Sequence, residues 1–194
     1  VCGLTRPQDA AAAYEAGAIY GGLIFVESSP RNVSETQARD VIAAAPLQYV
    51  GVFRNAAIEK VAATAGALSL AAVQLHGSED QDYINALREV LEPQVQIWKA
   101  LSVAEILPPR TLQHIDKYVL DNGQGGTGQR FDWSLLDGEK LDNVLLAGGL
   151  SPDNCVEAAK AGCAGLDFNS GVESQPGIKD ASKLASVFKT LRAY

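Results

Sequence analysis

Two residues able to do acid–base chemistry stand at the ends of apolar segments. Cys2 closes the first segment, and a cysteine thiolate acts as a base or a nucleophile when its pKa is lowered. Asp121 closes residues 117–121 and precedes a glycine-rich stretch at 122–128, where a partly desolvated carboxyl group could donate a proton. An inert buried thiol and a turn aspartate are the alternatives that these residues alone leave open.

Two glycine-containing turns follow later apolar segments: Gly148-Gly149, and Asn169-Ser170-Gly171. Backbone N–H groups in such turns, next to a helix N-terminus, bind phosphate without a lysine. The net charge of −7 would repel an anion, so local capture of this kind would be needed. Tight turns that simply require glycine are the alternative, but the pattern favours a phosphate site.

Other polar residues lie at comparable positions. Arg31, in a Ser-Pro-Arg loop, could bind a carboxylate bidentately, and His76 ends the apolar residues 72–76. Lys99 lies inside the apolar residues 95–101, where we expect it to point inward. It would then either form a Schiff base with a carbonyl substrate or neutralise a carboxylate such as Asp121 or Asp167. His114 falls at the opposite end of a strand and is expected to be a packing or surface residue.

The elements that position these residues alternate regularly between strands and helices. Eight strands are predicted, at 1–4, 19–25, 49–53, 72–76, 95–101, 117–121, 144–149 and 164–169. Helices are predicted at 7–16, 34–44, 56–65, 79–91, 152–161 and 180–192, with only a short or broken helix at 103–114 and a brief one at 131–136. Helix starts are marked by a capping box at Ser34 and by Ser151-Pro152.

Eight such units predict an α/β fold of the (β/α)8 TIM-barrel type, as one compact domain over residues 1–194. An open doubly wound sheet is the competitor, but its glycine-rich first turn is missing. In a barrel of this type, chemistry occurs at the carboxyl ends of the strands, where Cys2, Asp121 and both glycine turns fall.

Composition excludes several classes of protein. Apolar residues make up 47% and charged residues 20% of 194, as in an ordinary folded domain. No apolar run approaches a membrane span, and the 16 basic residues form no stripe for nucleic acid. The three cysteines, at 2, 155 and 163, lack metal-binding spacing and favour the reducing cytoplasm. Methionine is absent, which indicates either a processed start or a domain cut from a longer chain, and the abrupt beginning inside a predicted strand favours the second.

Ordered segments along the whole chain resemble the phosphoribosylanthranilate isomerase family. These are VCGLTR (1–6), GLIF (22–25), SPR (29–31), YVGVF (49–53), VQLHG (73–77), GGTG (125–128), FDW (131–133), LAGGL (146–150), GLDFNSGVE (165–173) and PGIKD (176–180). The resemblance is strongest to the form that makes up the C-terminal half of a bifunctional enterobacterial enzyme, after an indoleglycerol-phosphate synthase domain. It therefore implies a covalently fused partner, and we expect the isomerase domain itself to be monomeric.

The resemblance implies an Amadori rearrangement of N-(5-phosphoribosyl)anthranilate in tryptophan biosynthesis, without metal or organic cofactor. It assigns the general acid to Asp121, the general base to Cys2 and the anthranilate carboxylate to Arg31. It assigns the phosphate and the rest of the substrate to Gly148, Gly149, Asn169, Ser170 and Gly171, with His76 and Asp167. The order of the predicted strands around the barrel agrees with these assignments. A phosphate held after strands seven and eight places its ribose between Asp121 and Cys2.

Three alternatives give different expectations. A class I aldolase would form a Schiff base on Lys99. A silent barrel that only binds a ligand or supports a fused partner would not need both Cys2 and Asp121. A histidine-pathway isomerase would carry two catalytic aspartates in place of the cysteine–aspartate pair.

Overall fold

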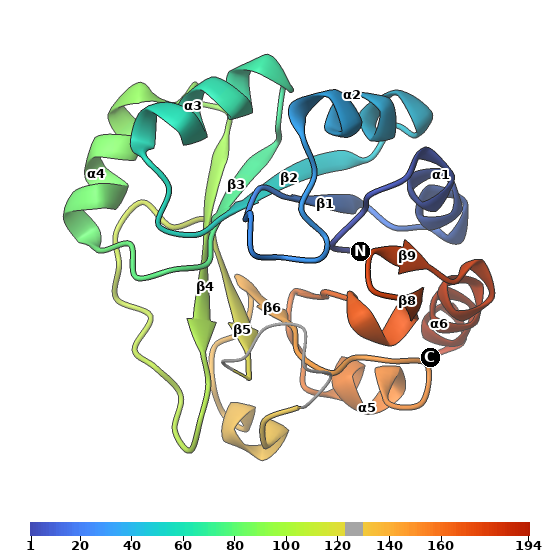
Figure 1. Cartoon of the computed structure of the whole chain (residues 1–194). Helices are drawn as coiled ribbons and strands as arrows, with labels where there is room; N and C mark the ends of the chain where they lie inside the picture. Colours follow the sequence, from blue (N-terminus) through green and yellow to red (C-terminus); the bar gives the residue numbers. More distant parts are fainter. Residues whose placement is uncertain (123–129) are drawn as a thin grey trace.

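The computed structural model describes residues 1–122 and 130–194, and its centre is a curved sheet of seven parallel strands (Figure 1). Each strand pairs with its sequence neighbours only. The strands are β1 (Tyr20–Ile24), β2 (Gln48–Phe53), β3 (Ala72–Leu75), β4 (Gln96–Ser102), β5 (Lys117–Asp121), β6 (Val144–Leu146) and β7 (Gly165–Leu166). This sequential order is what right-handed strand–helix–strand units produce when they curl into a ring.

Helices surround the sheet on its outer side (Figure 1). They are α1 (Pro7–Ala16), α2 (Glu35–Ala44), α3 (Ile58–Ala67), α4 (Gln81–Val90), α5 (Cys155–Lys160) and α6 (Ala181–Ala193), with 3-10 turns η1 (Trp133–Leu136) and η2 (Ser170–Val172). The predicted capping box of α2 is confirmed, since the Ser34 hydroxyl accepts from the Gln37 N–H and the Gln37 side chain accepts from the Ser34 N–H. The predicted bounds of α1, 7–16, are confirmed, and Gly17, at φ 106°, is its C-cap.

The first residues close the ring. The Cys2 N–H donates to the Phe168 carbonyl at 2.8 Å, and the Leu4 N–H donates to the Gly22 carbonyl at 2.9 Å. This segment therefore lies between β7 and β1 and fills the eighth position of a (β/α)8 barrel. The predicted strand at 1–4 is not a regular strand, because Gly3 has a φ of +71° and interrupts the extended backbone.

Alternation along the strands separates two apolar layers. Val73, Ile97 and Leu120 belong to the large core between sheet and helices, whereas Val119 and Ala147 belong to a smaller cluster inside the ring. Residues of the second set point toward the barrel axis because side chains of a strand alternate between its faces. This alternation decides which polar residues can reach a site inside the barrel.

Several predicted boundaries are wrong for local reasons. The strand predicted at 144–149 ends at Leu146, since Gly148 and Gly149 have φ of 86° and 67°. The helix predicted at 152–161 begins at Cys155, because the Ser151 N–H donates to Asn154 Oδ1 in a preceding turn. The short or broken helix predicted at 103–114 is absent, since these residues, which include two prolines, form no helix.

One element was not predicted at all: an antiparallel hairpin of β8 (Glu173–Gln175) and β9 (Ile178–Lys179).

In the described residues, no helix has the length and apolar character to cross a membrane.

Candidate active site

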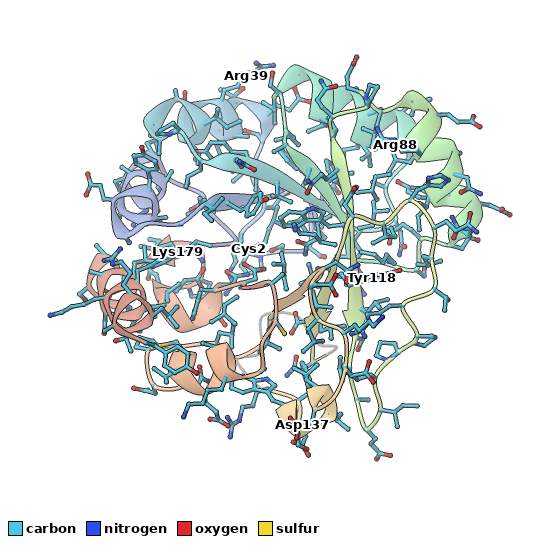
Figure 2. The ribbon with its side chains drawn as sticks, turned by 180° about the vertical axis from the view of Figure 1, so that it is seen from behind. Cys2, Arg39, Arg88, Tyr118, Asp137 and Lys179 are labelled. Carbon is cyan, nitrogen blue, oxygen red and sulfur yellow. The ribbon has the colours of Figure 1, made fainter. Side chains whose placement is uncertain are left out.

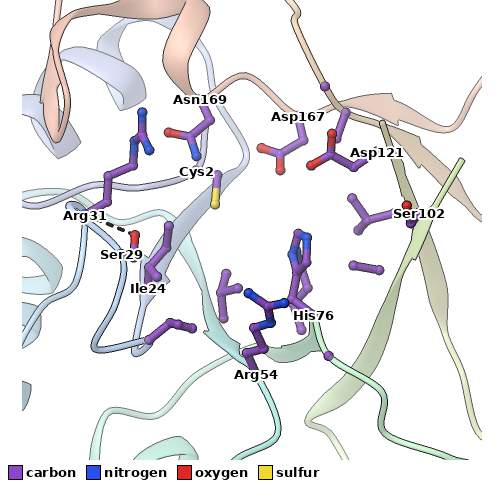
Figure 3. Close-up of a pocket in the computed structure, with 18 of the residues that line it drawn as sticks. Cys2, Ile24, Ser29, Arg31, Arg54, His76, Ser102, Asp121, Asp167 and Asn169 are labelled. Carbon is purple, nitrogen blue, oxygen red and sulfur yellow. Dashed lines mark hydrogen bonds between the residues drawn. The ribbon is translucent and has the colours of Figure 1, made fainter. Parts of the chain in front are cut away.

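A cavity of about 740 Å³ opens at the carboxyl ends of the strands (Figure 3). Its wall includes nearly all of the predicted site residues, namely Cys2, Arg31, His76, Asp121, Gly148, Gly149, Asp167, Asn169 and Ser170. These come from the amino-terminal segment and from the ends of five strands or the loops that follow them. These residues meet because each follows or ends a strand, and parallel strands place their carboxyl ends at one edge of the barrel.

Cys2 lies in the wall beside β1 and its sulfur points into the cavity (Figure 3). Space for it exists because Gly22 has no side chain, since a Cβ there would lie 2.7 Å from Sγ. Burial raises the pKa of the Cys2 thiol to about 12; the Asp167 carboxylate adds to the rise and Lys179 opposes it. The ligand-free site therefore holds a neutral thiol, and a nearby positive charge is needed to make it a base.

Asp121 and Asp167 occupy the same wall. Asp121 ends β5, is 8% exposed and accepts the Asn122 N–H through Oδ1 at 2.7 Å. Asp167, just after β7, lies between Asp121 and Cys2 (Figure 3). Burial raises the pKa of Asp167, and the charge of Asp121 adds to the rise. The wall thus presents a thiol and two carboxyl groups in a row.

The two glycine turns lie against each other at the cavity. A Cβ on Gly171 would lie 1.9 Å from the Leu150 carbonyl oxygen, so only glycine lets the two turns approach each other. The Gly149 carbonyl accepts from Asn154 Nδ2, and the Asn169 carbonyl accepts from Lys179 Nζ. Within the part of the chain described, no backbone carbonyl accepts from the N–H of Gly148 or Gly149. Such N–H groups are what a phosphate would need.

Arg31 is held by an acidic residue that sequence reasoning missed. Its Nε and Nη2 donate to the Glu173 carboxylate at 2.9 and 2.7 Å, and both side chains are buried. Lys179 Nζ donates to the same carboxylate at 2.8 Å and to Asn169 Oδ1 at 2.9 Å. Glu173 and Lys179 fall within the NSGVE and PGIKD segments, but their types and spacing gave no sign of this pairing.

His76 faces the cavity from β3. Gln74 Nε2 lies 3.2 Å from its Nδ1. Burial lowers the pKa of His76, while the carboxylates of Asp121 and Asp167 oppose that change. The balance favours a neutral imidazole at pH 7.

The expectation that Lys99 points inward is wrong. Trp98 and Ala100 face the ring interior, so alternation places Lys99 on the outer face of β4. Its Nζ donates to Glu79 Oε2 at 2.8 Å and to the Gly77 carbonyl at 2.7 Å. Its partner is Glu79, not Asp121 or Asp167, and Lys99 is absent from the lining of the cavity. Lys99 therefore cannot form the Schiff base that the class I aldolase alternative requires of it in this cavity.

The remaining candidate residues either do not line the cavity or lie outside the described part of the chain. His114 lies in an exposed loop before β5, Cys155 is buried in α5 and Cys163 is half-buried. The glycine-rich segment after Asn122 falls within 123–129, outside the described residues. Among residues 1–122 and 130–194, no group of three or more His, Cys, Asp and Glu side chains could hold a metal ion.

The fold and the cavity at the carboxyl ends of its strands are those of a (β/α)8-barrel enzyme. Comparison with known proteins narrows the class. The model of the N-(5'phosphoribosyl)anthranilate (PRA) isomerase family matches residues 1–190. The chain therefore belongs to the N-(5'-phosphoribosyl)anthranilate isomerase family.

Individual relatives agree with this assignment. The tryptophan biosynthesis protein TrpCF of Salmonella typhi is 74% identical over 194 residues, all of this chain and 43% of that protein. TrpCF of Yersinia pestis is 69% identical over 194 residues, again all of this chain and 41% of that protein. The chain thus spans about two-fifths of the length of these relatives.

Solved structures share the fold. Phosphoribosyl anthranilate isomerase from Thermus thermophilus has a TM-score of 0.88 and 31% identity, covering 99% of this chain and 96% of that one. A phosphoribosyl anthranilate isomerase in complex with reduced 1-(o-carboxyphenylamino)-1-deoxyribulose 5-phosphate has a TM-score of 0.82 and 30% identity. That match covers 100% of this chain and 97% of the other.

Proposed function

We propose that this chain converts N-(5-phosphoribosyl)anthranilate to 1-(2-carboxyphenylamino)-1-deoxyribulose 5-phosphate, an Amadori rearrangement in tryptophan biosynthesis. Family membership supports the reaction. The observation that carries the catalytic assignment is the row of Cys2, Asp167 and Asp121 along one wall of the cavity that the two glycine turns also line. A ribose fixed by its phosphate at those turns would have an acid on one side and a base on the other.

Asp121 acts first as general acid. It donates a proton to the furanose ring oxygen, the C1–O bond breaks, and the anthranilate nitrogen supplies the electron pair that forms a C1=N iminium ion. The ionised form of Asp121 then remains beside the cation. A group that is buried yet close to solvent suits this role, because it can be reprotonated after each turnover.

Cys2 then removes the C2 proton. Burial holds its pKa at about 12, so the thiol is a poor base until a cation appears next to it. The iminium ion is that cation, and its charge lowers the thiol pKa at the step that needs the thiolate. The electrons of the C2–H bond neutralise the iminium nitrogen and give an enolamine. Protonation at C1 and loss of the C2 hydroxyl proton give the ketone, with every atom conserved.

The substrate's two ends are held by different groups. The turns at Gly148-Gly149 and Asn169–Gly171 bind the phosphate through backbone N–H groups. His76 and Asp167 contact the sugar. Arg31 contributes Nη1 to the anthranilate carboxylate, since Glu173 occupies its Nε and Nη2.

Fluorescence of freshly made phosphoribosylanthranilate, with indoleglycerol-phosphate synthase in excess, measures the reaction. We expect Asp121→Asn to lower kcat by about 10²- to 10⁴-fold, because general acid catalysis is worth that much, while the reduced product analogue still binds. Cys2→Ser should lose several orders of magnitude, as serine is a much poorer base. Cys163→Ser, which changes a half-buried cysteine away from the cavity, is the matched control. Wild-type rates in either active-site variant would refute its assigned role.

The wider setting is also proposed. The lengths of the TrpCF relatives favour a domain, residues 1–194, cut from a bifunctional chain in which indoleglycerol-phosphate synthase is the fused partner. We infer that the domain works in the cytoplasm and is monomeric. Sedimentation equilibrium of the isolated chain tests the monomer, and a dimer at micromolar concentration would contradict it.

A further inference from the structure

Arg54 is a cation at the cavity that the assignments above do not use. It directly follows β2 and continues the inward alternation of Val50 and Val52. The residue is exposed and lines the cavity, and its guanidinium points toward His76 (Figure 3). In the described chain, neither a hydrogen bond nor an ion pair engages it.

The other cations near the cavity are already engaged by buried carboxylates, and two of them, Arg31 and Lys179, share the carboxylate of Glu173. Arg31 is bound by Glu173, and its guanidinium turns to the Asn169 side, away from His76 (Figure 3). Lys99 and Lys179 are paired with Glu79 and Glu173 behind the cavity wall. Residues 123–129 contain no lysine or arginine. An anionic group entering the cavity therefore meets one unpaired guanidinium among the described lining residues, that of Arg54.

The position of Arg54 in the ring indicates which end of the substrate it meets. The amino-terminal segment and β1 to β7 make eight positions, so β2 lies opposite β6, with β7 next to β6. The glycine turns follow β6 and β7. A ligand whose phosphate sits at those turns extends across the cavity, and its far end approaches the loop after β2. Asp121 and Asp167 make the middle of this path acidic.

We propose that Arg54 binds the aromatic carboxylate of the substrate and is a specificity-determining residue. The inference rests on the proposed function and deepens it. A guanidinium with both edges free forms two parallel N–H···O bonds to a carboxylate. Arg31 offers only Nη1, because Glu173 occupies its Nε and Nη2, so Arg54 supplies the unpaired guanidinium that selects anthranilate over an uncharged aniline.

The test compares two substrates that differ only in that carboxylate: N-(5-phosphoribosyl)anthranilate and N-(5-phosphoribosyl)aniline. For Arg54→Gln we expect the KM of the first to rise at least tenfold, equal to about 1.4 kcal/mol, with kcat within twofold. The KM of the aniline substrate should stay within twofold of wild type. Arg54→Lys should restore part of the loss, because it keeps the charge but not the paired geometry.

Arg39→Gln, an exposed arginine on the outer helix layer far from Cys2 (Figure 2), is the matched control and should leave both KM values unchanged. Equal KM changes for both substrates would place Arg54 on the phosphoribosyl part and overturn the proposal. Unchanged KM values, or a fall in kcat alone, would overturn it too.

A binding arm separates this inference from the proposed function. Calorimetric titration uses the reduced product analogue and its counterpart without the carboxyl group. Arg54→Gln should weaken only the first, at least tenfold, whether or not the protein turns over substrate. Equal affinities of wild type and variant for the carboxylated analogue would overturn the role of Arg54. Absence of turnover in the wild type, with this difference intact, would refute the proposed reaction alone.

Discussion

The buried ion pair of Lys99 and Glu79 allows a quantitative prediction about stability. Their Nζ and Oε2 atoms are 2.8 Å apart, and the two side chains are 5% and 1% exposed. Glu79 also accepts the N–H groups of Asn55 and Gly77 at 2.7 and 2.9 Å. Burial opposes ionisation, but these hydrogen bonds and Lys99 outweigh it and hold the pKa of Glu79 below its ordinary value.

The perturbation is Lys99→Met, which keeps the length of the side chain and removes its charge. Breaking a buried pair by removing one partner costs about 3–5 kcal/mol. Because Glu79 would keep two backbone donors, we expect the lower end, about 3 kcal/mol. That is roughly a 150-fold change in the unfolding constant. For a domain of this size it lowers Tm by roughly 6–12 °C.

The matched control is an exposed pair of the same length. Arg130 Nη1 and Glu157 Oε2 are 2.7 Å apart, but their side chains are 50% and 59% exposed. Exposed pairs contribute about 0–1 kcal/mol, so Glu157→Gln should change stability by less than about 1 kcal/mol. Since the two distances are nearly equal, burial alone accounts for the expected difference.

Urea denaturation followed by tryptophan fluorescence measures both variants. The double variant Lys99→Met/Glu79→Leu removes the stranded carboxylate and should recover part of the lost stability. A Lys99→Met variant within about 1 kcal/mol of wild type would refute the reasoning. So would a double variant that is no more stable than the single one.

Two further predictions concern the sulfur of Cys2 and the acid range. Gly22→Ala places a Cβ 2.7 Å from Cys2 Sγ, so we expect kcat to fall at least tenfold with little change in KM. The control is Gly66→Ala, whose Cβ has nothing near it and which should leave both constants unchanged. Equal kinetics in the two variants would contradict this prediction. Glu79 and Glu173 both have a folded-state pKa below the ordinary 4.5, so their contribution to stability is present above pH 4.5 and is lost as the pH falls through the lowered values. In Lys99→Met the folded-state pKa of Glu79 should rise because its cation is gone, so the free energy of unfolding should fall less below pH 4.5 than in wild type; equal losses in the two proteins would exclude the linkage.

The sequence was informative where a repeating pattern has physical consequences. The predicted bounds of β5 and α1, 117–121 and 7–16, match the structure, because an apolar run bounded by charges and a proline-to-glycine segment each have defined ends. Cys2 and Asp121 were expected at one edge of the sheet for the same reason. Their place in the cavity wall follows from chain order in a parallel barrel.

Other features could not be predicted in this way. The strands of the β8–β9 hairpin have three and two residues, too few for periodicity to register, so Glu173 and Lys179 received no role. The face of Lys99 was predicted wrongly because residues 95–101 are apolar on both sides of β4. A run without alternation does not indicate which residues point into the ring.

Both missed pairs perform the same physical task on opposite sides of the cavity. Glu79 joins Asn55, Gly77 and Lys99, which belong to the loops after β2 and β3 and to β4. Glu173 joins Arg31 and Lys179, which belong to the loop after β1 and to β9, and Lys179 also holds Asn169. These buried carboxylates hold together loops that are far apart in sequence.

This arrangement would let an acidic pocket receive the proposed substrate, which has two anionic ends. A free lysine beside Asp121 would form an ion pair with it, and that would hinder the proton donation proposed for this residue. Cations paired behind the wall avoid that contact, and the phosphate is left to oriented N–H groups that carry no net charge. The charge that remains available, on Arg54, lies across the ring from the phosphate turns, where it can attract the carboxylate without neutralising the acid.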